Sequence, residues 1–379
     1  MRIALVAPLV TPIAQPFVGG SQALVADLAL GMVQRGHEVT LFAREGSSIP
    51  GVKIEPVVVP DSVIPSRFSE PGTAQSADPG FMIQANVFFE LFLQLRQRAS
   101  EFDILHAHAF DWPCFTASAL LTTLPVLHTI HLPAVSPEIN AVLGILQRQQ
   151  HPFTLITVSQ ACARDYASYT TFDHIIYNGL DLDAIPFVLQ VADDAPLLFA
   201  GRITPEKGVE EAIEIAEQAG RQLLLAGGIY DQSYYSERIV PRLEVGQGRI
   251  HYLGQLDHPT LWQLMGQAQG LLFPIAWDEP FGLTPVEAMA AGTPVIAFQR
   301  GAVTEVIRDQ QTGFLIPAGD CAQAAAAVAR LATIERSACR AHVVANFSLK
   351  RMLDAHEQVY TLAMDRATAV GRVPAAQPL

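Results

Sequence analysis

Charge is scarce in this sequence, and positive charge is scarcer than negative. Only 16% of the 379 residues are charged and 50% are hydrophobic, so large buried cores are expected and global disorder is not. The net charge of −13 argues against a nucleic-acid or anionic-membrane surface across the whole protein, although a local basic pocket stays open. The length suits two domains better than one.

Cysteine and long apolar runs are also rare. The four cysteines form no Cys-x-x-Cys pair and no Cys/His cluster with zinc spacing, so we expect free thiols in a reducing cytoplasm. The N-terminal run "IALVAPLV" is too short to span a membrane and is followed by no signal-peptide cleavage pattern. It is better interpreted as a first β-strand.

Short apolar runs alternate with helical patterns along most of the chain. "RIALVAP", "HEVTLFA", "DILHAHA", "LPVLHTIHLP" and "TLITVSQ" indicate strands, and "SQALVADLALGMVQRG" indicates a helix. The rhythm restarts after residues 183–196, a segment with two prolines and an acidic cluster that is typical of a linker. Apolar strands separated by helices predict parallel sheets covered on both faces, here in two consecutive α/β units.

Two segments of the first unit leave alternatives open. Residues 59–80 are rich in Pro, Ser and Gly and predict a loop. Residues 81–100 predict an apolar helix, which either covers the first sheet or contacts a membrane. Its basic residues are confined to one end, which favours the core helix.

A turn between a strand and a helix carries two cations. In "FAGRITPEKGVEEAIEIA", Arg202 and Lys207 flank the turn, where free backbone N–H groups and the helix dipole create positive potential. Together they could neutralise a diphosphate, with about 1.5–3 kcal/mol from each charge-assisted hydrogen bond. Alternatively, the two cations pair with Glu206 or Glu210 on a solvated turn.

Two carboxylates lie near a second helix start, in "WDEPFGLTPVEAMAAGTPV". Glu279 lies in a Pro-Gly turn, where a carboxylate could accept hydrogen bonds from the hydroxyls of a sugar. For Glu287 a structural explanation competes, because Thr284 at the N-cap, Pro285 at the first helical position and Glu287 at the third would form a capping box.

Candidates in the first unit are weaker. His131 follows an apolar strand, and open α/β sheets bind ligands at the carboxyl ends of their strands, although a packed or solvent-facing loop histidine is an equal alternative. His106 and His108 alternate with alanine and would share one face, but a metal site would lack a third ligand. Gly19-Gly20 would let a ligand approach the backbone closely, yet the spaced GxGxxG fingerprint is absent.

Taken together, these motifs resemble a known family. "GRITPEKG" followed by "EPFGLTPVEAMAAGTPV" is similar to the retaining glycosyltransferases of family 4, the glycosyl transferases group 1, which adopt the GT-B fold. The early "GG", "GHEVTLF", "DILHAHAF", "TIHLP", "YNGLD" and "YLGQL" also resemble segments of that family. The resemblance covers roughly residues 1–365.

The resemblance implies an α/β protein in which two Rossmann-like domains with parallel sheets face each other across a cleft. An acceptor-side domain would span residues 1–182 and a nucleotide-sugar-binding domain residues 183–350. A helix at 351–365 would cross back to the first domain, and 366–379 would form a flexible tail.

By the same resemblance, each candidate residue has a role. Arg202 and Lys207 match the diphosphate-binding pair, Glu279 the acid that contacts the donor sugar and Glu287 the acid that contacts the ribose. His131 matches the histidine near the transferred sugar. The remaining donor contacts fall on backbone groups of Gly19, Gly20, Leu256, Phe281, Gly282, Leu283 and Thr284. Ser21-Gln22 departs from the family, in which many members carry an acidic residue shortly after the glycines.

The expected reaction moves a sugar from a nucleotide diphosphate-sugar to a hydroxyl acceptor with retention of configuration and without a metal or other cofactor. UDP is slightly preferred as the nucleotide, and the acceptor is either a small molecule or lipid-linked, the latter with peripheral membrane contact. No nucleic-acid partner is expected. A nucleotide-sugar epimerase of the same architecture and a non-catalytic sugar-nucleotide binder remain as alternatives.

Overall fold

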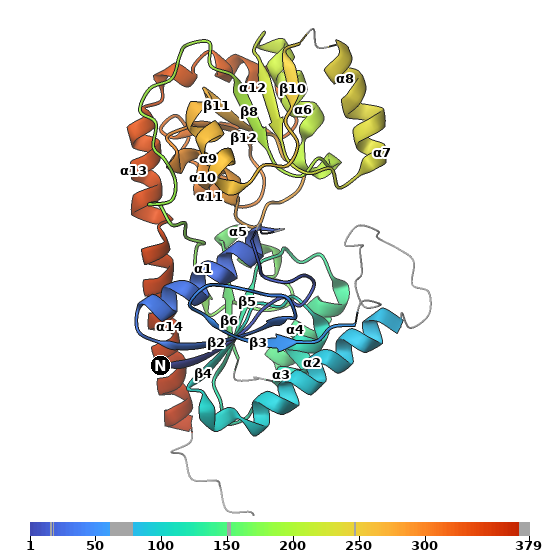
Figure 1. Ribbon diagram of the computed structural model, residues 1–379, viewed down its shortest axis with the longest axis vertical. Helices are drawn as coiled ribbons and strands as arrows, with labels where there is room; N and C mark the ends of the chain where they lie inside the picture. Colours follow the sequence, from blue (N-terminus) through green and yellow to red (C-terminus); the bar gives the residue numbers. More distant parts are fainter. Residues whose placement is uncertain (16, 18, 61–78, 150–152, 246–247, 371–379) are drawn as a thin grey trace, which may run out of the picture. The chain divides into compact units, whose positions relative to one another are not determined.

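The computed structural model describes residues 1–15, 17, 19–60, 79–149, 153–245 and 248–370. The chain divides into two compact units (Figure 1). The first comprises Met1–Val158, Cys162–Ile176 and Met352–Leu379, and the second comprises Ser159–Ala161 and Tyr177–Arg351. The loop predicted at 59–80 lies mostly outside the described residues.

The first unit is built on a parallel sheet. Among its described residues, seven strands pair in the order β3-β2-β1-β4-β5-β6-β7. The strands are β1 (Arg2–Val6), β2 (Glu38–Arg44), β3 (Lys53–Val57), β4 (Ile104–Ala107), β5 (Val126–Ile130), β6 (Thr154–Thr157) and β7 (His174–Ile175). The helices are α1 (Gly20–Gln34), α2 (Pro79–Gln97), α3 (Trp112–Ser118), α4 (Pro137–Arg148), α5 (Gln160–Asp165) and α14 (Leu349–Val370). Of the last two, α5 belongs to this unit from Cys162 onward and α14 from Met352 onward.

Helices cover both faces of this sheet, as the continuous apolar strands predict. Phe88, Phe92 and Leu95 of α2 are fully buried in a cluster that also contains side chains of β1, β4 and α3. The core-helix interpretation of residues 81–100 is therefore confirmed. In α1, Gly31 packs directly against Leu353 of α14, which lets these two helices approach closely.

The second unit repeats the architecture. Its described residues form a six-stranded parallel sheet in the order β10-β9-β8-β11-β12-β13. The strands are β8 (Leu197–Ala200), β9 (Leu223–Ala226), β10 (Ile250–Tyr252), β11 (Gly270–Phe273), β12 (Val295–Phe298) and β13 (Gly313–Ile316). The helices are α6 (Val209–Gln218), α7 (Gln232–Tyr234), α8 (Val240–Val245), α9 (His258–Gln267), α10 (Leu283–Ala290), α11 (Val303–Val306), α12 (Cys321–Val328) and α13 (Arg336–Asn346).

The boundaries between the units differ from those expected at 182/183 and 350/351. The second unit begins again at Tyr177, because Tyr177 packs against Phe281 and Phe347 and donates a hydrogen bond to Glu305. Helix α14 continues to Val370, past the start expected for a tail at 366, and residues 371–379 lie outside the described residues.

The segment expected to be a linker, 183–196, has no regular secondary structure but is bound to the second unit. Arg336 of α13 donates to the carbonyl oxygen of Val188 at 2.8 Å, and Arg340 donates to that of Ile185 at 3.2 Å. The path of the linker is therefore set by guanidinium groups that reach its backbone carbonyls.

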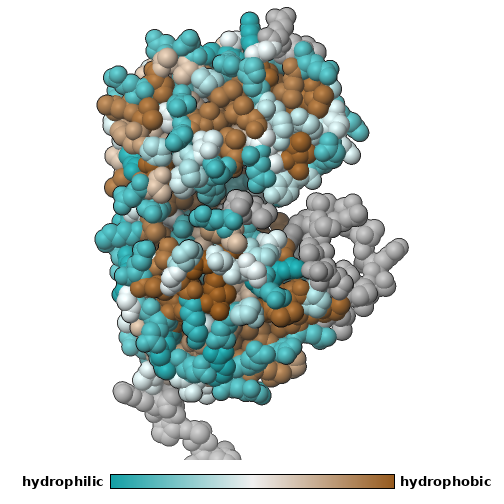
Figure 2. Space-filling view, in the orientation of Figure 1, coloured by the Kyte–Doolittle hydropathy of each residue, from teal (hydrophilic) through white to brown (hydrophobic). Residues whose placement is uncertain are grey.

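No helix among the described residues is long and apolar enough to cross a membrane. On the face shown in Figure 2, hydrophobic patches alternate with hydrophilic side chains within each unit. Helix α2 exposes Phe89, whose relative exposure is 51%, whereas Phe88 and Phe92 of the same helix are buried. The apolar character of α2 is therefore explained mainly by its place in the core.

Candidate active site

The strand-to-helix turn after β8 has a backbone that only glycine permits. A short 3-10 helix, Pro205–Lys207, leads into Gly208, which has φ 75° and precedes α6. A Cβ atom at Gly208 would lie 1.9 Å from the carbonyl oxygen of Pro274. The backbone N–H of Ala276 also donates to the carbonyl of Glu206 at 2.9 Å. These contacts bring the "PEKG" turn directly against the loop that carries Glu279.

Lys207 and Glu279 form an ion pair at this contact. Lys207 Nζ lies 3.0 Å from Glu279 Oε2, and the two side chains are 15% and 13% exposed. Trp277 donates its indole N–H to the same oxygen at 2.9 Å, and Lys207 Nζ lies 4.7 Å from the centre of the Trp277 ring. Both hydrogen bonds within the described part of the chain go to Oε2, which leaves Oε1 of Glu279 available to a ligand.

Arg202 pairs with Glu206, which is one of the alternatives that the sequence left open. Its guanidinium lies 3.3 Å from Glu206 Oε1 and is 48% exposed. Its Cζ atom lies 5.6 Å from the centre of the Tyr230 ring, and Glu206 is also bound by the hydroxyl of Thr204 at 2.8 Å. An exposed pair of this kind contributes little to stability. The guanidinium can therefore exchange Glu206 for an anionic ligand at low cost.

The prediction that Thr284 and Glu287 form a capping box is wrong. Helix α10 begins at Leu283, and its N-cap is Gly282 with φ 95°, without a side-chain cap. Thr284 is therefore the second helical residue, and Glu287 lies too far into the helix to reach the N-cap. The backbone N–H groups of Leu283 and Thr284 have no intrahelical acceptor, and Pro285 has no N–H at all. The helix thus begins with two free donors at residues where donor contacts were expected.

Glu287 points to a neighbouring helix. It is 9% exposed, and its Oε1 accepts a hydrogen bond from the indole N–H of Trp262 on α9 at 3.1 Å. Burial raises the pKa of this carboxyl above its ordinary value. A buried carboxylate with one protein donor retains acceptor capacity that paired hydroxyls, such as those of a ribose, could use.

The remaining donor-side candidates differ in exposure. The Phe281 ring is 2% exposed and packs edge-on against Phe347, with ring centres 5.7 Å apart. The Phe281 side chain is therefore occupied by packing inside the second unit. Leu256 is partly buried in the loop between β10 and α9, beside Asp257, which caps α9.

In the first unit, His131 directly follows β5. Tyr166 donates its hydroxyl to the carbonyls of Leu132 and Pro133 at 3.2 and 3.0 Å, which holds the loop after His131 in place. Burial lowers the pKa of His131 to about 4. Its Nε2 lies 3.0 Å from Nδ1 of His108, so the histidine is neither isolated nor free in a loop.

His106 lies on β4, and His108 follows the last residue of that strand. The two ring nitrogens of His106 are bound to the hydroxyls of Tyr360 and Thr129, at 2.8 and 2.7 Å. No cluster of three or more His, Cys, Asp or Glu side chains among the described residues could hold a metal. The prediction that His106 and His108 share one face is consistent with their ring centres, which lie 4.1 Å apart.

Gly19 and Gly20 stand at the start of α1. Gly19 is the N-cap, and its backbone N–H donates to Gln22 Oε1 at 2.9 Å. Gln22 also donates its side-chain N–H to the hydroxyl of Thr11. Gln22, which belongs to the Ser21-Gln22 pair that departs from the family pattern, therefore caps the start of α1 and holds the glycine turn in place.

Sequence reasoning missed several side chains that shape these sites. The roles of Trp277 and Trp262 were missed, because only the folded structure shows that they donate hydrogen bonds to Glu279 and Glu287. Asp111 was missed as well; it accepts a 2.6 Å hydrogen bond from Gln84, and burial raises its pKa to about 6. A carboxyl of this kind follows β4 in "FDWP", where an acidic residue after a strand could have signalled it.

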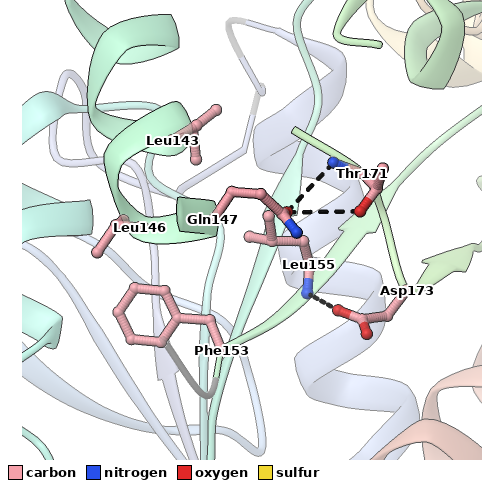
Figure 3. Close-up of a pocket in the computed structure, with 7 residues that line it drawn as sticks. All are labelled: Leu143, Leu146, Gln147, Phe153, Leu155, Thr171 and Asp173. Atoms are coloured by element: carbon pink, nitrogen blue, oxygen red, sulfur yellow. Dashed lines mark hydrogen bonds between the residues drawn. The ribbon is translucent and has the colours of Figure 1, made fainter. Parts of the chain in front are cut away.

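One cavity of the first unit lies away from these residues. It has a volume of about 140 Å³ and is lined by Leu143, Leu146, Gln147, Phe153, Leu155, Thr171 and Asp173 (Figure 3). Its polar groups are already bound to one another: Thr171 donates to Gln147 at 3.4 Å and the Leu155 amide donates to Asp173 at 2.9 Å. The cavity therefore offers little unsatisfied polarity for a ligand.

Known protein families cover both units. Residues 18–184 match Glycosyltransferase Family 4, and residues 183–343 match Glycosyl transferases group 1. The chain is 30% identical to a glycogen synthase of Mycobacterium tuberculosis over 291 residues, which is 69% of each chain. It is 26% identical to a D-inositol 3-phosphate glycosyltransferase of Jonesia denitrificans over 364 residues, covering 83% of this chain and 84% of the relative.

Solved structures show the same architecture. Sucrose-phosphate synthase from Thermosynechococcus elongatus superimposes with a TM-score of 0.78 at 21% identity, over 97% of this chain and 100% of the other. The Anabaena protein HepE, solved with UDP and glucose, gives a TM-score of 0.72 at 18% identity, over 96% and 100%. Both likenesses support the fold, and the sequence relatives support the enzyme class. The chain therefore belongs to glycosyltransferase family 4 and is a glycosyltransferase with two Rossmann-like domains of the GT-B fold.

Proposed function

We propose that this glycosyltransferase moves a sugar from a nucleoside diphosphate-sugar to a hydroxyl acceptor, with retention of the anomeric configuration and without a metal ion. The observation that carries the proposal is the 3.0 Å pair between Lys207 and Glu279. A cation suited to a phosphate and an acid suited to sugar hydroxyls lie side by side, as the two ends of a sugar phosphate require.

The diphosphate would lie at the turn that carries Arg202 and Lys207. The free N–H groups of Leu283 and Thr284 at the start of α10 add donors, and α10 has no acidic residue in its first turn to compete for them. The half-exposed Arg202 can change its partner from Glu206 to a phosphate. As the leaving diphosphate gains charge, these groups would stabilise it.

The sugar and ribose would be held by the two acids. Glu279 Oε1 can accept hydrogen bonds from sugar hydroxyls while Oε2 stays with Lys207 and Trp277. Glu287, held by Trp262, would accept from the ribose hydroxyls, and the backbone near Leu256 would meet the base. Uracil is our expectation for the base. HepE was solved with UDP, whereas a starch synthase IV structure that this chain also resembles was bound to ADP.

The proposed chemistry occurs on one face of the sugar. A bond forms between the acceptor oxygen and the anomeric carbon while the bond from that carbon to the phosphate oxygen breaks. The acceptor proton passes to the departing diphosphate. Lys207 and Arg202 supply the positive charge that a bound cation would otherwise provide.

The acceptor is a hydroxyl compound, either a small molecule or a lipid-linked one, and the second case would bring peripheral contact with a membrane. All four cysteines, Cys114, Cys162, Cys321 and Cys339, are free and buried, which supports the expectation of a reducing, cytoplasmic setting.

The decisive experiment incubates the protein with UDP-, ADP- and GDP-sugars and a panel of acceptors, with products identified by mass spectrometry. We expect a glycosylated acceptor and one free nucleoside diphosphate, and NMR should show the donor's anomeric configuration in the product. An inverted product would overturn the retaining mechanism. Conversion of one nucleotide-sugar into its epimer, or binding without turnover, would support the two alternatives instead.

A further inference from the structure

The partly buried His131 ring adjoins a group of buried histidines in the first unit. The His108 and His131 rings are stacked, with centres 5.3 Å apart and planes 20° apart, and Nδ1 of His108 lies 3.0 Å from Nε2 of His131. His106 packs against His108, and His356 of α14 lies 5.5 Å from His106 between ring centres. His108 therefore contacts both His131 and His106, and His356 contacts His106.

Both rings of the pair are neutral near neutral pH. Burial lowers the pKa of His108 well below its ordinary value, and nearby His131, His356 and His128 lower it further. Burial also lowers the pKa of His131 to about 4, with His356 adding to the effect. A neutral imidazole has one N–H donor and one acceptor nitrogen, so the 3.0 Å contact admits two arrangements.

In the first arrangement, His108 donates from Nδ1–H and His131 accepts at Nε2. His108 Nε2 is then an unprotonated lone pair, and His131 carries its proton on Nδ1. In the second arrangement, His131 donates from Nε2–H, and His108 must carry its own proton on Nε2. The two arrangements thus differ in what they leave at His108 Nε2 and in what His131 can offer a ligand.

His108 Nε2 decides between them. This nitrogen is buried, the side chain is 1% exposed, and no described residue offers it a hydrogen-bond partner. A buried N–H group without an acceptor is rarer and less favourable than an acceptor with a free lone pair. The second arrangement would place such an orphaned N–H there, whereas the first would not.

We propose that His108 is a positioning residue that donates to His131 Nε2 and so holds His131 in the Nδ1–H form. His131 then presents a hydrogen-bond donor, and not a general base, at the carboxyl end of β5. This assignment concerns the protein itself; only the identity of the recipient, an oxygen of the transferred sugar, rests on the proposed function.

The neighbouring histidine does not impose the same constraint. His106 contacts two hydroxyls, those of Tyr360 and Thr129, and a hydroxyl can either donate or accept. Either tautomer of His106 is therefore satisfied. The constraint on His131 arises at His108, because one His108 nitrogen faces His131 and the other has no hydrogen-bond partner among the described residues.

The test reads the tautomer directly by long-range proton–nitrogen NMR of the full-length protein labelled with nitrogen-15 histidine. Comparison with His131→Gln identifies the His131 signals. We expect the nitrogen that couples to both ring carbon-bound protons, Nε2, to have the shift of an unprotonated nitrogen. A protonated Nε2 on His131 in the unmodified protein would overturn the proposal, whether or not any variant folds.

Three variants separate positioning from packing. His108→Leu removes the donor and should move His131 toward the Nε2–H form, whereas His108→Asn keeps an amide N–H near the Nδ1 position and should preserve the original form. His128→Leu alters a buried histidine that does not bond to His131, and it should leave the tautomer unchanged. An unchanged His131 tautomer in folded His108→Leu would contradict the proposal.

Kinetics give the second readout. His108→Leu should lower kcat/KM roughly fivefold to tenfold, as expected for one hydrogen bond, and His108→Asn should restore it. If transfer is absent in every preparation while the NMR result is as expected, the proposed function fails and the tautomer assignment stands. If transfer occurs and His131 is protonated at Nε2, the assignment fails alone.

Discussion

Lys207 Nζ lies 3.0 Å from Glu279 Oε2 although 72 residues separate the two side chains. The ion pair joins the turn after β8 to the loop before α10, and Trp277 contributes a hydrogen bond and a ring face to the same group. A largely buried pair with these contacts has a defined geometry before any ligand arrives.

Substitution of Lys207 tests the diphosphate site. Lys207→Ala should lower kcat/KM by about 10²- to 10³-fold, because a preorganised charge at the leaving group is lost. Circular dichroism should show an intact fold, since Glu279 keeps its bond to Trp277. Arg238→Ala removes an exposed cation paired with Glu210 in the same unit and should leave turnover unchanged. Equal turnover of the two variants would contradict the proposed role of Lys207 at the diphosphate.

Substitution of Glu279 separates sugar binding from nucleotide binding. Glu279→Gln frees Lys207 from its ion pair, so the affinity for UDP without a sugar should stay the same or increase. Transfer should fall at least tenfold, because the amide is a weaker acceptor for sugar hydroxyls. Calorimetry and initial rates measure the two effects, with exposed Glu237→Gln as the control. A parallel loss of UDP affinity and transfer would contradict a contact specific to the sugar.

The buried carboxylate of Glu287 should lower the stability of the fold and strengthen nucleotide binding. Burial raises the pKa of the folded carboxyl, so the folded protein binds more protons than the unfolded chain between the two pKa values. The free energy of unfolding therefore falls as pH rises through that interval and stays lower above it. Glu287→Gln should remove this fall, which denaturant titrations at several pH values can measure.

The same variant should bind the nucleotide less well. Loss of charge-assisted hydrogen bonds to ribose, about 1.5–3 kcal/mol each, would weaken UDP affinity by about tenfold or more. Glu237→Gln, at an exposed position, should change neither quantity. Unchanged UDP affinity in Glu287→Gln would exclude the ribose contact.

At Gly208, the turn proposed to bind the diphosphate requires a residue without a Cβ atom. Gly208→Ala places a Cβ atom 1.9 Å from the Pro274 carbonyl oxygen in a left-handed conformation, so both stability and transfer should fall. Gly220→Ala is a matched control, because Gly220 has φ 65° and no described atom within 4 Å of the added Cβ. The control should cost only the left-handed strain, about 1–2 kcal/mol, and keep full transfer activity. Equal thermal unfolding shifts for the two variants would contradict the close approach.

Removal of metal ions tests whether the transfer proceeds without a metal. Dialysis against EDTA should leave the transfer rate unchanged within experimental error, because Arg202 and Lys207 supply the charge at the diphosphate. Added Mg²⁺ or Mn²⁺ should then have no effect beyond ionic strength. A rate that is lost on dialysis and restored by either ion would overturn this part of the proposal.

Local patterns were sufficient for much of the architecture. The alternation of apolar strands and amphipathic helices predicted two parallel sheets, and α2 was recognised as a core helix from the placement of its charges. Strand β3 was missed because its "KIEPV" residues are partly exposed and include Pro56, which is typical of an edge strand. Tyr177 joins the second unit ahead of the boundary expected at 182/183, because it packs against Phe281 and Phe347, which are distant in sequence.

The chain by itself determined which residues we propose for the chemistry, because the spacing of Arg202, Lys207, Glu279 and Glu287 around turns is a property of local sequence. Only the tertiary structure decided their partners. Lys207 faces Glu279 and not a neighbour on its own turn, Glu287 bonds to Trp262 and does not cap α10, and His131 bonds to His108. Spacing along a helix or strand determines which side chains share a face. The residue opposite that face depends on how strands pair and helices pack, and distant segments of the chain settle both.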